Sequence, residues 1–429
     1  MGSDRLARLR DRRTVKYCGA IALIAVWCAG VDAQTATSAS RQVKQTRAAD
    51  DKTPLQLFPV ESLWTLALNN GLTAAPAFDA TRGFFPLEGD QLAAYDLVGR
   101  RLLWIAPVHT TVEPVAGNGL VFVVEPGFLV ALRVEDGVAA WRVPFAETLA
   151  VPLAFAGEWL VAATTAGDVA AHRASDGALA WRQHLNAPAH ARPEVVGTRI
   201  FVPTSDAHVI ALNSTSGVPL WDRRLGKPGN EILATDERLY LGSEDRYFYC
   251  LNAMTGAVEW RWTTGANVIG RPVVDEQTVY FVSLDNVLRA LNVSSGVQRW
   301  KSSLSVRPST GPVKWSQTLV VAGTTPGLKA FNANNGKPAG QSSTASELSA
   351  PPHLVTDTSS PFPVLLAVTS DITGRATVTA STRTVEPTIL PTTPLPNAVV
   401  PAPPVDPPED LGAVSPLPNL SPASPAAGP

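Results

Sequence analysis

Seven tryptophans recur at nearly even intervals along the chain, and their period determines the architecture to expect. The intervals are 40, 37, 40, 40, 39 and 40 residues. The tryptophans are Trp64, Trp104, Trp141, Trp181, Trp221, Trp260 and Trp300. One aromatic residue in each unit of about 40 residues is typical of radial or stacked repeats. Such a chain distributes its core over many similar units instead of building one enzyme pocket from scattered motifs.

Six units align without a gap, and each runs eleven residues from a small residue to its tryptophan. The small residues are Ala94, Ala131, Ala171, Ala211, Cys250 and Ala290. A seventh copy starts at Ala330 and keeps the turn, but it has Gly340 where the tryptophan belongs. The repeat therefore continues past the last tryptophan.

Each unit has the residues of a β-hairpin. Asparagines end an apolar strand, where their side chains can bond to backbone two residues on, and glycines then supply the positive φ of a tight turn. These residues are Asn213, Asn252, Asn292 and Asn332, followed by Gly217, Gly256, Gly296 and Gly336. In the first unit Gly99 falls one place early, which predicts a different turn. Each tryptophan is expected to rest on the neighbouring unit and bury about 150–250 Å².

Two further strands are predicted before each hairpin. Residues 120–124, 200–202 and 279–282 are short β-branched or aromatic runs bounded by turn residues. Prolines precede a shorter apolar run in most units, at Pro114, Pro152, Pro193, Pro272 and Pro312. Four strands per unit are the content of a propeller blade. No long stretch has a period of 3.6 residues, so few helices are expected.

The blade count predicts an all-β, eight-bladed β-propeller of four-stranded antiparallel blades joined by tryptophan docking. Six blades have complete hairpins, the seventh ends near Gly340, and residues 350–379 provide three strands of the eighth. Trp64 has no hairpin of its own, so residues 63–68 are expected to close the last blade from the other end of the chain. Seven blades remain the alternative if residues 350–380 only flank the ring.

The eleven-residue unit resembles the tryptophan-docking motif of the PQQ-like, quinoprotein-type β-propeller repeat, over roughly residues 55–383. In size and blade count the chain is most similar to the BamB family. That resemblance implies a non-catalytic envelope scaffold with protein partners, namely components of outer-membrane β-barrel assembly. It also implies a location in the periplasm or at the periplasmic face of the outer membrane.

Quinoprotein dehydrogenases share the repeat and provide the runner-up interpretation. Their resemblance implies a quinone (PQQ) at the ring axis with a bound Ca²⁺, a catalytic aspartate and, in many, a disulfide between adjacent cysteines. No two cysteines are adjacent here, and no carboxylate can be matched to those positions. We therefore expect no catalytic residue, no cofactor and no metal site. A propeller that binds a small molecule or polysaccharide is the third interpretation.

The two ends of the chain differ in composition from the repeats. Residues 1–33 have the basic and apolar regions of a secretory signal peptide. Residues 34–53 are predicted to be a flexible linker, residues 54–384 the propeller, and residues 385–429 a disordered proline-rich tail. Lipidation at Cys28 or an uncleaved anchor are alternatives for the leader, although Trp27 stands where a lipid-attachment motif has a small residue.

Composition and motifs exclude several classes of function. The formal net charge of −2 gives no basic surface for nucleic acid. Hydrolase, zinc-protease and phosphate-loop motifs do not occur. The histidines show no helical spacing of metal ligands, and although His184 and His190 could meet across one blade-top loop, a metal site there is not expected. Aspartates near one phase of the repeat are interpreted as turn residues, namely Asp168, Asp206, Asp245 and Asp285.

Two local features complete the prediction. Cys250 occupies the small-residue position of its unit and is expected to be a buried core thiol. The loop after Trp221 is locally basic and is the candidate docking loop for a partner, through Arg223, Arg224 and Lys227. Arginine is favoured at binding hot spots.

Overall fold

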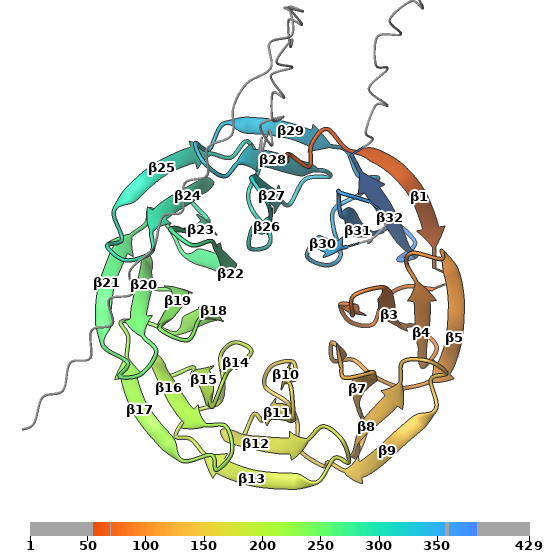
Figure 1. Ribbon diagram of the computed structural model, residues 1–429. Helices are drawn as coiled ribbons and strands as arrows, with labels where there is room; N and C mark the ends of the chain where they lie inside the picture. Colours follow the sequence, from red (N-terminus) through yellow and green to blue (C-terminus); the bar gives the residue numbers. More distant parts are fainter. Residues whose placement is uncertain (1–54, 69, 357–359, 384–429) are drawn as a thin grey trace, which may run out of the picture. The chain divides into compact units, whose positions relative to one another are not determined.

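The computed structural model describes residues 55–68, 70–356 and 360–383. These residues form eight separate four-stranded antiparallel sheets. Each sheet is one blade, and the eight blades stand in a ring with their first strands toward the axis and their fourth strands on the circumference (Figure 1). The prediction of eight blades is confirmed, and the alternative of seven is wrong because residues 353–382 form strands of a complete blade.

The first four blades use consecutive strands. Blade 1 is β2 (Ala77–Phe78), β3 (Arg82–Leu87), β4 (Gln91–Asp96) and β5 (Arg101–Pro107). Blade 2 is β6 (Val115–Gly117), β7 (Leu120–Glu125), β8 (Phe128–Arg133) and β9 (Ala139–Pro144). Blade 3 is β10 (Ala154–Ala156), β11 (Trp159–Ala163), β12 (Asp168–Arg173) and β13 (Leu179–His184). Blade 4 is β14 (Glu194–Val196), β15 (Arg199–Pro203), β16 (His208–Asn213) and β17 (Pro219–Arg224).

The next three blades follow the same order, and the eighth does not. Blade 5 is β18 (Gly229–Ala234), β19 (Arg238–Ser243), β20 (Tyr247–Asn252) and β21 (Val258–Thr263). Blade 6 is β22 (Val268–Val274), β23 (Thr278–Ser283), β24 (Val287–Asn292) and β25 (Gln298–Ser303). Blade 7 is β26 (Val313–Trp315), β27 (Thr318–Ala322), β28 (Leu328–Asn332) and β29 (Pro338–Ser342). Blade 8 is β30 (His353–Val355), β31 (Val364–Ser370), β32 (Ala376–Thr382) and β1 (Glu61–Ala67).

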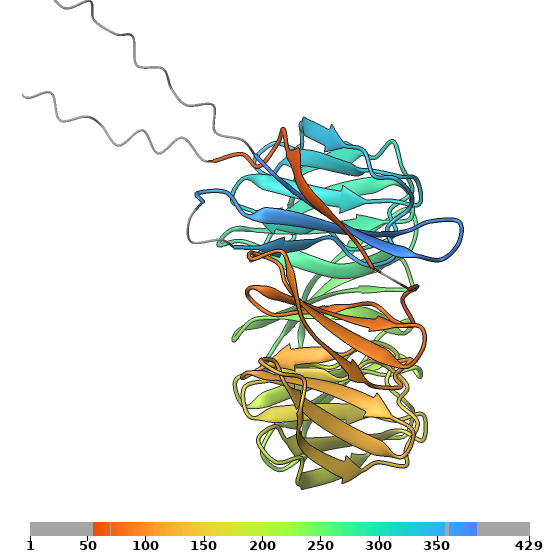
Figure 2. The ribbon, with the colours of Figure 1, turned by 90° about the vertical axis from the view of Figure 1, so that its right-hand side faces the viewer.

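The ring is closed by β1, which comes from the opposite end of the sequence. It pairs antiparallel with β32, and Trp64 lies opposite Ala380. Figure 2 shows β1, in red, beside the blue strands of blade 8. The predicted closing strand is therefore confirmed. Closure in this way removes an edge that would otherwise be open to unwanted pairing.

One register is common to all blades. In blade 6, Tyr280 of β23 pairs with Ala290 of β24, and Ala290 pairs with Trp300 of β25. The equivalent pairs in blade 8 are Leu366 with Ala380, and Ala380 with Trp64. Because the register repeats, a residue at one repeat position occupies the same place relative to the axis in every blade.

The hydrophobic core lies in layers between neighbouring blades. One such layer joins Tyr280 and Val282 of blade 6 to Leu319 and Val321 of blade 7, and all four side chains are buried. Their second strands therefore bury both faces, which explains the nearly continuous apolar runs in the sequence.

Three predicted segments lie outside the described residues, namely the leader 1–33, the linker 34–53 and the tail 385–429. Over the part of the chain that the structure describes, we find no helix with the length and apolar character needed to cross a membrane.

Candidate functional site

Six tryptophans join each blade to the next by the same hydrogen bond. Each indole Nε1–H donates to a main-chain carbonyl oxygen in the next hairpin, over 2.7–3.1 Å. The donors are Trp104, Trp141, Trp181, Trp221, Trp260 and Trp300, and the acceptors are Val134, Ala174, Ser214, Ala253, Val293 and Ala333. Each indole thus fixes the hairpin of the next blade by a directional bond in addition to apolar contact.

The hairpin glycines are required for two reasons. Gly217 has a φ of +72°, and a Cβ placed on it would lie 2.4 Å from Cε3 of Trp181. The same relation links Gly256 to Trp221 and Gly336 to Trp300. Glycine therefore provides both the left-handed backbone and the space for the indole of the preceding blade.

Trp64 differs from the other six tryptophans. It packs against a buried cluster that includes Tyr95 and Leu97 of blade 1. The indole bond of the other six is not found for Trp64 among the described residues. In the first hairpin the positive φ of 56° falls on Arg100, one place after Gly99. A side chain thus occupies the position where the other hairpins leave room for an indole.

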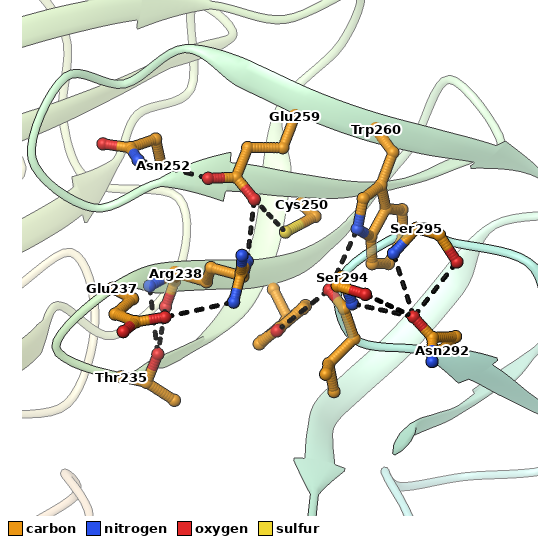
Figure 3. A network of polar contacts seen from close by, with 12 residues as sticks. Thr235, Glu237, Arg238, Cys250, Asn252, Glu259, Trp260, Asn292, Ser294 and Ser295 are labelled. Carbon is orange, nitrogen blue, oxygen red and sulfur yellow. Dashed lines mark hydrogen bonds and ion pairs between the residues drawn. The ribbon is translucent and has the colours of Figure 1, made fainter. Parts of the chain in front are cut away.

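The joint between blades 5 and 6 contains a polar network around Cys250 (Figure 3). Trp260 Nε1 and the Tyr240 hydroxyl both donate to the Val293 carbonyl oxygen, over 3.0 and 3.4 Å. Arg238 Nε lies 2.7 Å from Glu259 Oε2, which is 4.0 Å from the sulfur of Cys250. Burial raises the pKa of the Cys250 thiol to about 12. The predicted buried thiol is confirmed, and it stays protonated at neutral pH.

The predicted docking loop is divided by the fold. Arg223 Nε donates to the Gly256 carbonyl oxygen over 2.6 Å, so this guanidinium belongs to the joint between blades 4 and 5. Arg224 at the end of β17 and Lys227 in the connection to β18 are exposed. Only these two cations of the predicted loop are free to meet a partner.

Three of the four aspartates interpreted as turn residues bond within their own turns, and Asp168 instead forms an ion pair across its hairpin. Asp206 accepts a hydrogen bond from Thr204, and Asp245 accepts one from the Tyr247 amide. Asp285 pairs with the buried Arg289 over 2.5 Å, and this pairing lowers the pKa of the Asp285 carboxyl to about 2 against the effect of its burial. Asp168 lies 2.8 Å from His184 Nδ1.

His184 and His190 have different partners, since His190 Nε2 lies 3.4 Å from Glu244. Within the described ranges, no three His, Cys, Asp or Glu side chains are placed to hold a metal ion.

A cavity of about 1060 Å³ lies on the ring axis and is lined by residues from all eight blades. The shared register defines one ring of side chains in the wall of this cavity. In each blade, the second-strand residue opposite the small residue of the repeat unit also pairs with a first-strand residue. The ring member lies two positions before that first-strand residue. This axial ring consists of Ala75, Glu113, Pro152, Arg192, Glu231, Arg271, Gly311 and Pro351. Its charged members belong to blades 2, 4, 5 and 6, whereas blades 1, 3, 7 and 8 contribute small or neutral residues.

Ion pairs cross the charged half of the axial ring. Arg192 Nη2 lies 2.8 Å from Glu113 Oε1, and this contact passes over blade 3. Arg271 pairs with Glu194 of blade 4 and donates from Nε to the Ile232 carbonyl oxygen over 3.2 Å. Burial raises the pKa of the Glu194 carboxyl, although the Arg271 guanidinium opposes the shift. These pairs hold both arginine side chains against the wall.

The axial ring was not predicted from the sequence. The sequence does contain a signal for this ring. In several blades the ring member directly precedes a proline near the first strand, as in Glu113-Pro114 and Arg271-Pro272. Recognising this position as axial required the register between blades.

The wall of the axial cavity does not fit the Ca²⁺ and quinone that the quinoprotein resemblance implies. Of its two carboxylates, Glu113 is engaged by Arg192, and the nearby Glu194, outside the lining, is engaged by Arg271. The second, Glu231, belongs to no group of three potential metal ligands among the described residues. The donor set therefore gives no support to dehydrogenase chemistry at the axis.

Together these features define an eight-bladed β-propeller whose blades are joined by indole-to-carbonyl bonds around an axial cavity. A family model described as "Outer membrane protein assembly factor BamB" matches residues 126–235 and 225–382. These matches extend over more than half of the 429 residues, and the chain belongs to this family.

Solved structures show similarity in fold. BamB from Moraxella catarrhalis has a TM-score of 0.61 at 18% identity, over 75% of this chain and 99% of that one. Quinohemoprotein alcohol dehydrogenase from Comamonas testosteroni has a TM-score of 0.61 at 11% identity, over 76% of this chain and 78% of that one. Sqt1 from Saccharomyces cerevisiae has a TM-score of 0.63 at 12% identity, over 74% of this chain and 98% of that one. No curated protein sequence matches the chain.

Proposed function

We propose that this chain is a non-catalytic propeller scaffold that binds protein partners in the assembly of outer-membrane proteins. The observation that carries the proposal is the match to the BamB family over residues 126–382. The proposed partners are components of the barrel-assembly machinery. The leader 1–33 supports export to the periplasm, where such a scaffold would work.

The ring is suited to this role because it is rigid where the blades meet. Six indole-to-carbonyl bonds fix the positions of successive hairpins, so loops on one face keep constant spacing. A preorganised surface binds with less loss of conformational freedom than a mobile one. Arg224 and Lys227 are exposed, three positions apart in sequence, at the connection between blades 4 and 5, and we propose them as part of the docking surface.

Crosslinking in native envelopes tests the partner proposal. The full chain would be tagged, crosslinked mildly and purified, and its partners identified by mass spectrometry. We expect an outer-membrane assembly protein at near-stoichiometric yield. The variant R224E/K227E should reduce that yield severalfold, whereas K301E/K337E, which reverses two exposed cations on blades 6 and 7, should not. Recovery of the chain alone would refute the scaffold proposal.

We also propose that the chain works without a quinone. Titration of the purified protein with PQQ and Ca²⁺ should leave the absorption spectrum of the quinone unchanged. A saturable spectral shift would favour the dehydrogenase interpretation instead.

A further inference from the structure

The axial ring contains one carboxylate without an ion pair. Arg192 is paired with Glu113, and Arg271 is paired with Glu194, which lies outside the lining of the cavity, so each guanidinium of the ring already has its own carboxylate. The carboxylate left over is that of Glu231, an exposed side chain in the first strand of blade 5. Within the described residues it makes no ion pair, although its neighbours in the ring are both arginines. When the carboxylates that pair with the two arginines are counted with the ring, one negative charge, that of Glu231, is left over.

The other cation of the cavity does not compensate for Glu231. Lys314 on blade 7 has its own carboxylate, Asp275, at 3.6 Å, and its ammonium also donates to the Ser316 carbonyl oxygen over 2.8 Å. His353 is stacked on Phe78 with ring centroids 4.3 Å apart, and burial lowers the pKa of this imidazole. At neutral pH the imidazole is therefore uncharged and adds no positive charge to the wall.

Prolines remove some of the main-chain donors of the wall. Seven of its residues are prolines, and a proline has no N–H to offer a ligand. They are Pro76, Pro114, Pro152, Pro272, Pro312, Pro351 and Pro352. A ligand that brings its own hydrogen-bond donors suits such a wall better than one that needs donors from it.

We infer that the axial cavity binds a protonated amine, and that the Glu231 carboxylate is the group that recognises its charge. An ammonium brings three donors and one positive charge, which match the acceptor oxygens and the unpaired negative charge of Glu231. Arg192 and Arg271 are each paired with another glutamate. Glu231, the ring member between these two arginines, therefore remains available to the amine. The amine can belong to a small molecule or to a lysine side chain on a segment that enters the cavity.

The charge selectivity of the cavity can be measured with a cysteine opposite Glu231. Ala75 occupies the axial ring in blade 1, across the axis from blade 5 (Figure 1). The variant A75C would be made in a C18S/C28S/C250A background, where alanine at 250 repeats the residue of the other units. Rates of modification by a cationic and an anionic methanethiosulfonate would then be compared. V297C, at an exposed residue of a hairpin, provides the reference ratio.

We expect the ratio of cationic to anionic rates at A75C to exceed that at V297C by about tenfold, the lower end of the usual effect of a charged cleft. E231Q should return the ratio to the reference value, and E231K should invert it. Melting temperatures of the variants check that the ring is intact. Equal ratios at the two cysteines, or a ratio at A75C that E231Q leaves unchanged, would overturn the inference.

Protection of A75C identifies the source of the amine. Butylammonium should slow modification at A75C, whereas butyrate and butanol should not. A lysine peptide that protects where butylammonium fails would assign the site to a protein segment, and protection by butylammonium would assign it to free amines. Protection by neither, or equal protection by butyrate, contradicts the inference. No assembly partner is needed, so these results are independent of the scaffold proposal.

Discussion

Phe58 packs against Gly340, at the one hairpin strand where the repeat lacks its tryptophan. A Cβ placed on Gly340 would lie 2.9 Å from Cβ of Phe58 and 3.0 Å from its Cδ1. Phe58 and the adjacent Leu57 are both buried, in a cluster with strands of blades 7 and 8. Arg383 donates to the carbonyl oxygens of Gln56 and Phe58 over 2.8 and 3.2 Å. A segment before the first strand therefore fills the joint that the seventh unit leaves incomplete.

Replacement of Phe58 by alanine should destabilise the ring by about 3–5 kcal/mol, the usual cost of removing a fully buried phenylalanine. Urea unfolding of the full chain measures the change. L55A is the matched control, because Leu55 lies three residues earlier and is exposed, and it should change stability by less than about 0.5 kcal/mol. Similar losses in the two variants would argue that Phe58 does not fill the joint.

The tryptophans should differ in what their indole nitrogens contribute. Trp181 Nε1 donates to the Ser214 carbonyl oxygen over 2.7 Å, whereas no such bond is found for Trp64 in the described part of the chain. Phenylalanine keeps a ring but removes the donor. W181F should therefore cost about 1–3 kcal/mol, since a buried carbonyl loses its partner, and W64F should cost clearly less. Chemical denaturation of both variants at one pH makes the comparison, and equal costs would contradict it.

The sequence predicts the ring well because each unit repeats the same local chemistry. The glycine of each hairpin and the tryptophan four residues later can be read directly, and they define the blade and its neighbour. The closing strand could be predicted because Trp64 has the right phase but no hairpin. The joint made by Phe58 could not, because Phe58 has no repeat position and contacts Gly340 only through the closed ring.

The candidate sites were harder to predict for a similar reason. Arg223 looks like a surface charge in a basic loop, but its guanidinium is used by the Gly256 carbonyl of the next blade. Glu231 and Arg271 are far apart in sequence from Glu113, and nothing local marks them as members of one ring. Contacts across the axis depend on the curvature and closure of eight sheets, which local periodicity does not encode.

Cys250 should be unreactive while the ring is folded. Its side chain is fully buried, so a reagent cannot reach the sulfur. The pKa of its thiol is raised to about 12, so almost no thiolate is present at pH 8. In a C18S/C28S background, a maleimide should react only as fast as the ring unfolds, and 8 M urea should release complete labelling. Rapid labelling of the folded protein, at the rate of the V297C control, would show that the joint between blades 5 and 6 opens locally.

His172 should make the ring less stable in mild acid. It occupies a position where blades 2, 4, 5 and 6 have leucine, and it is buried at 5% exposure with Nε2 unpartnered. Its Nδ1 lies 3.0 Å from the Gly177 carbonyl oxygen, in the hairpin that holds Trp141. Burial lowers the pKa of this imidazole from the usual 6.5, against the weaker effects of the Gly177 carbonyl and of Glu147, while Arg182 lowers it further.

The sign of the pH effect follows from this shift. The unfolded chain takes up a proton at His172 near pH 6.5, and the folded chain does so only at lower pH, so stability falls as the pH falls below about 6.5. H172L removes this dependence and should leave stability within about 1 kcal/mol at pH 7.5, since one hydrogen bond is lost and one unpartnered nitrogen is removed. His353 has a lowered pKa as well, but it is present in both proteins and does not affect their difference. We therefore expect urea unfolding to show that the stability of H172L relative to the natural chain is greater at pH 5.0 than at pH 7.5. H109L replaces an exposed histidine and should show no such increase. If the difference in free energy of unfolding between H172L and the natural chain is the same at both pH values, His172 is protonated in the folded ring as readily as in the unfolded chain.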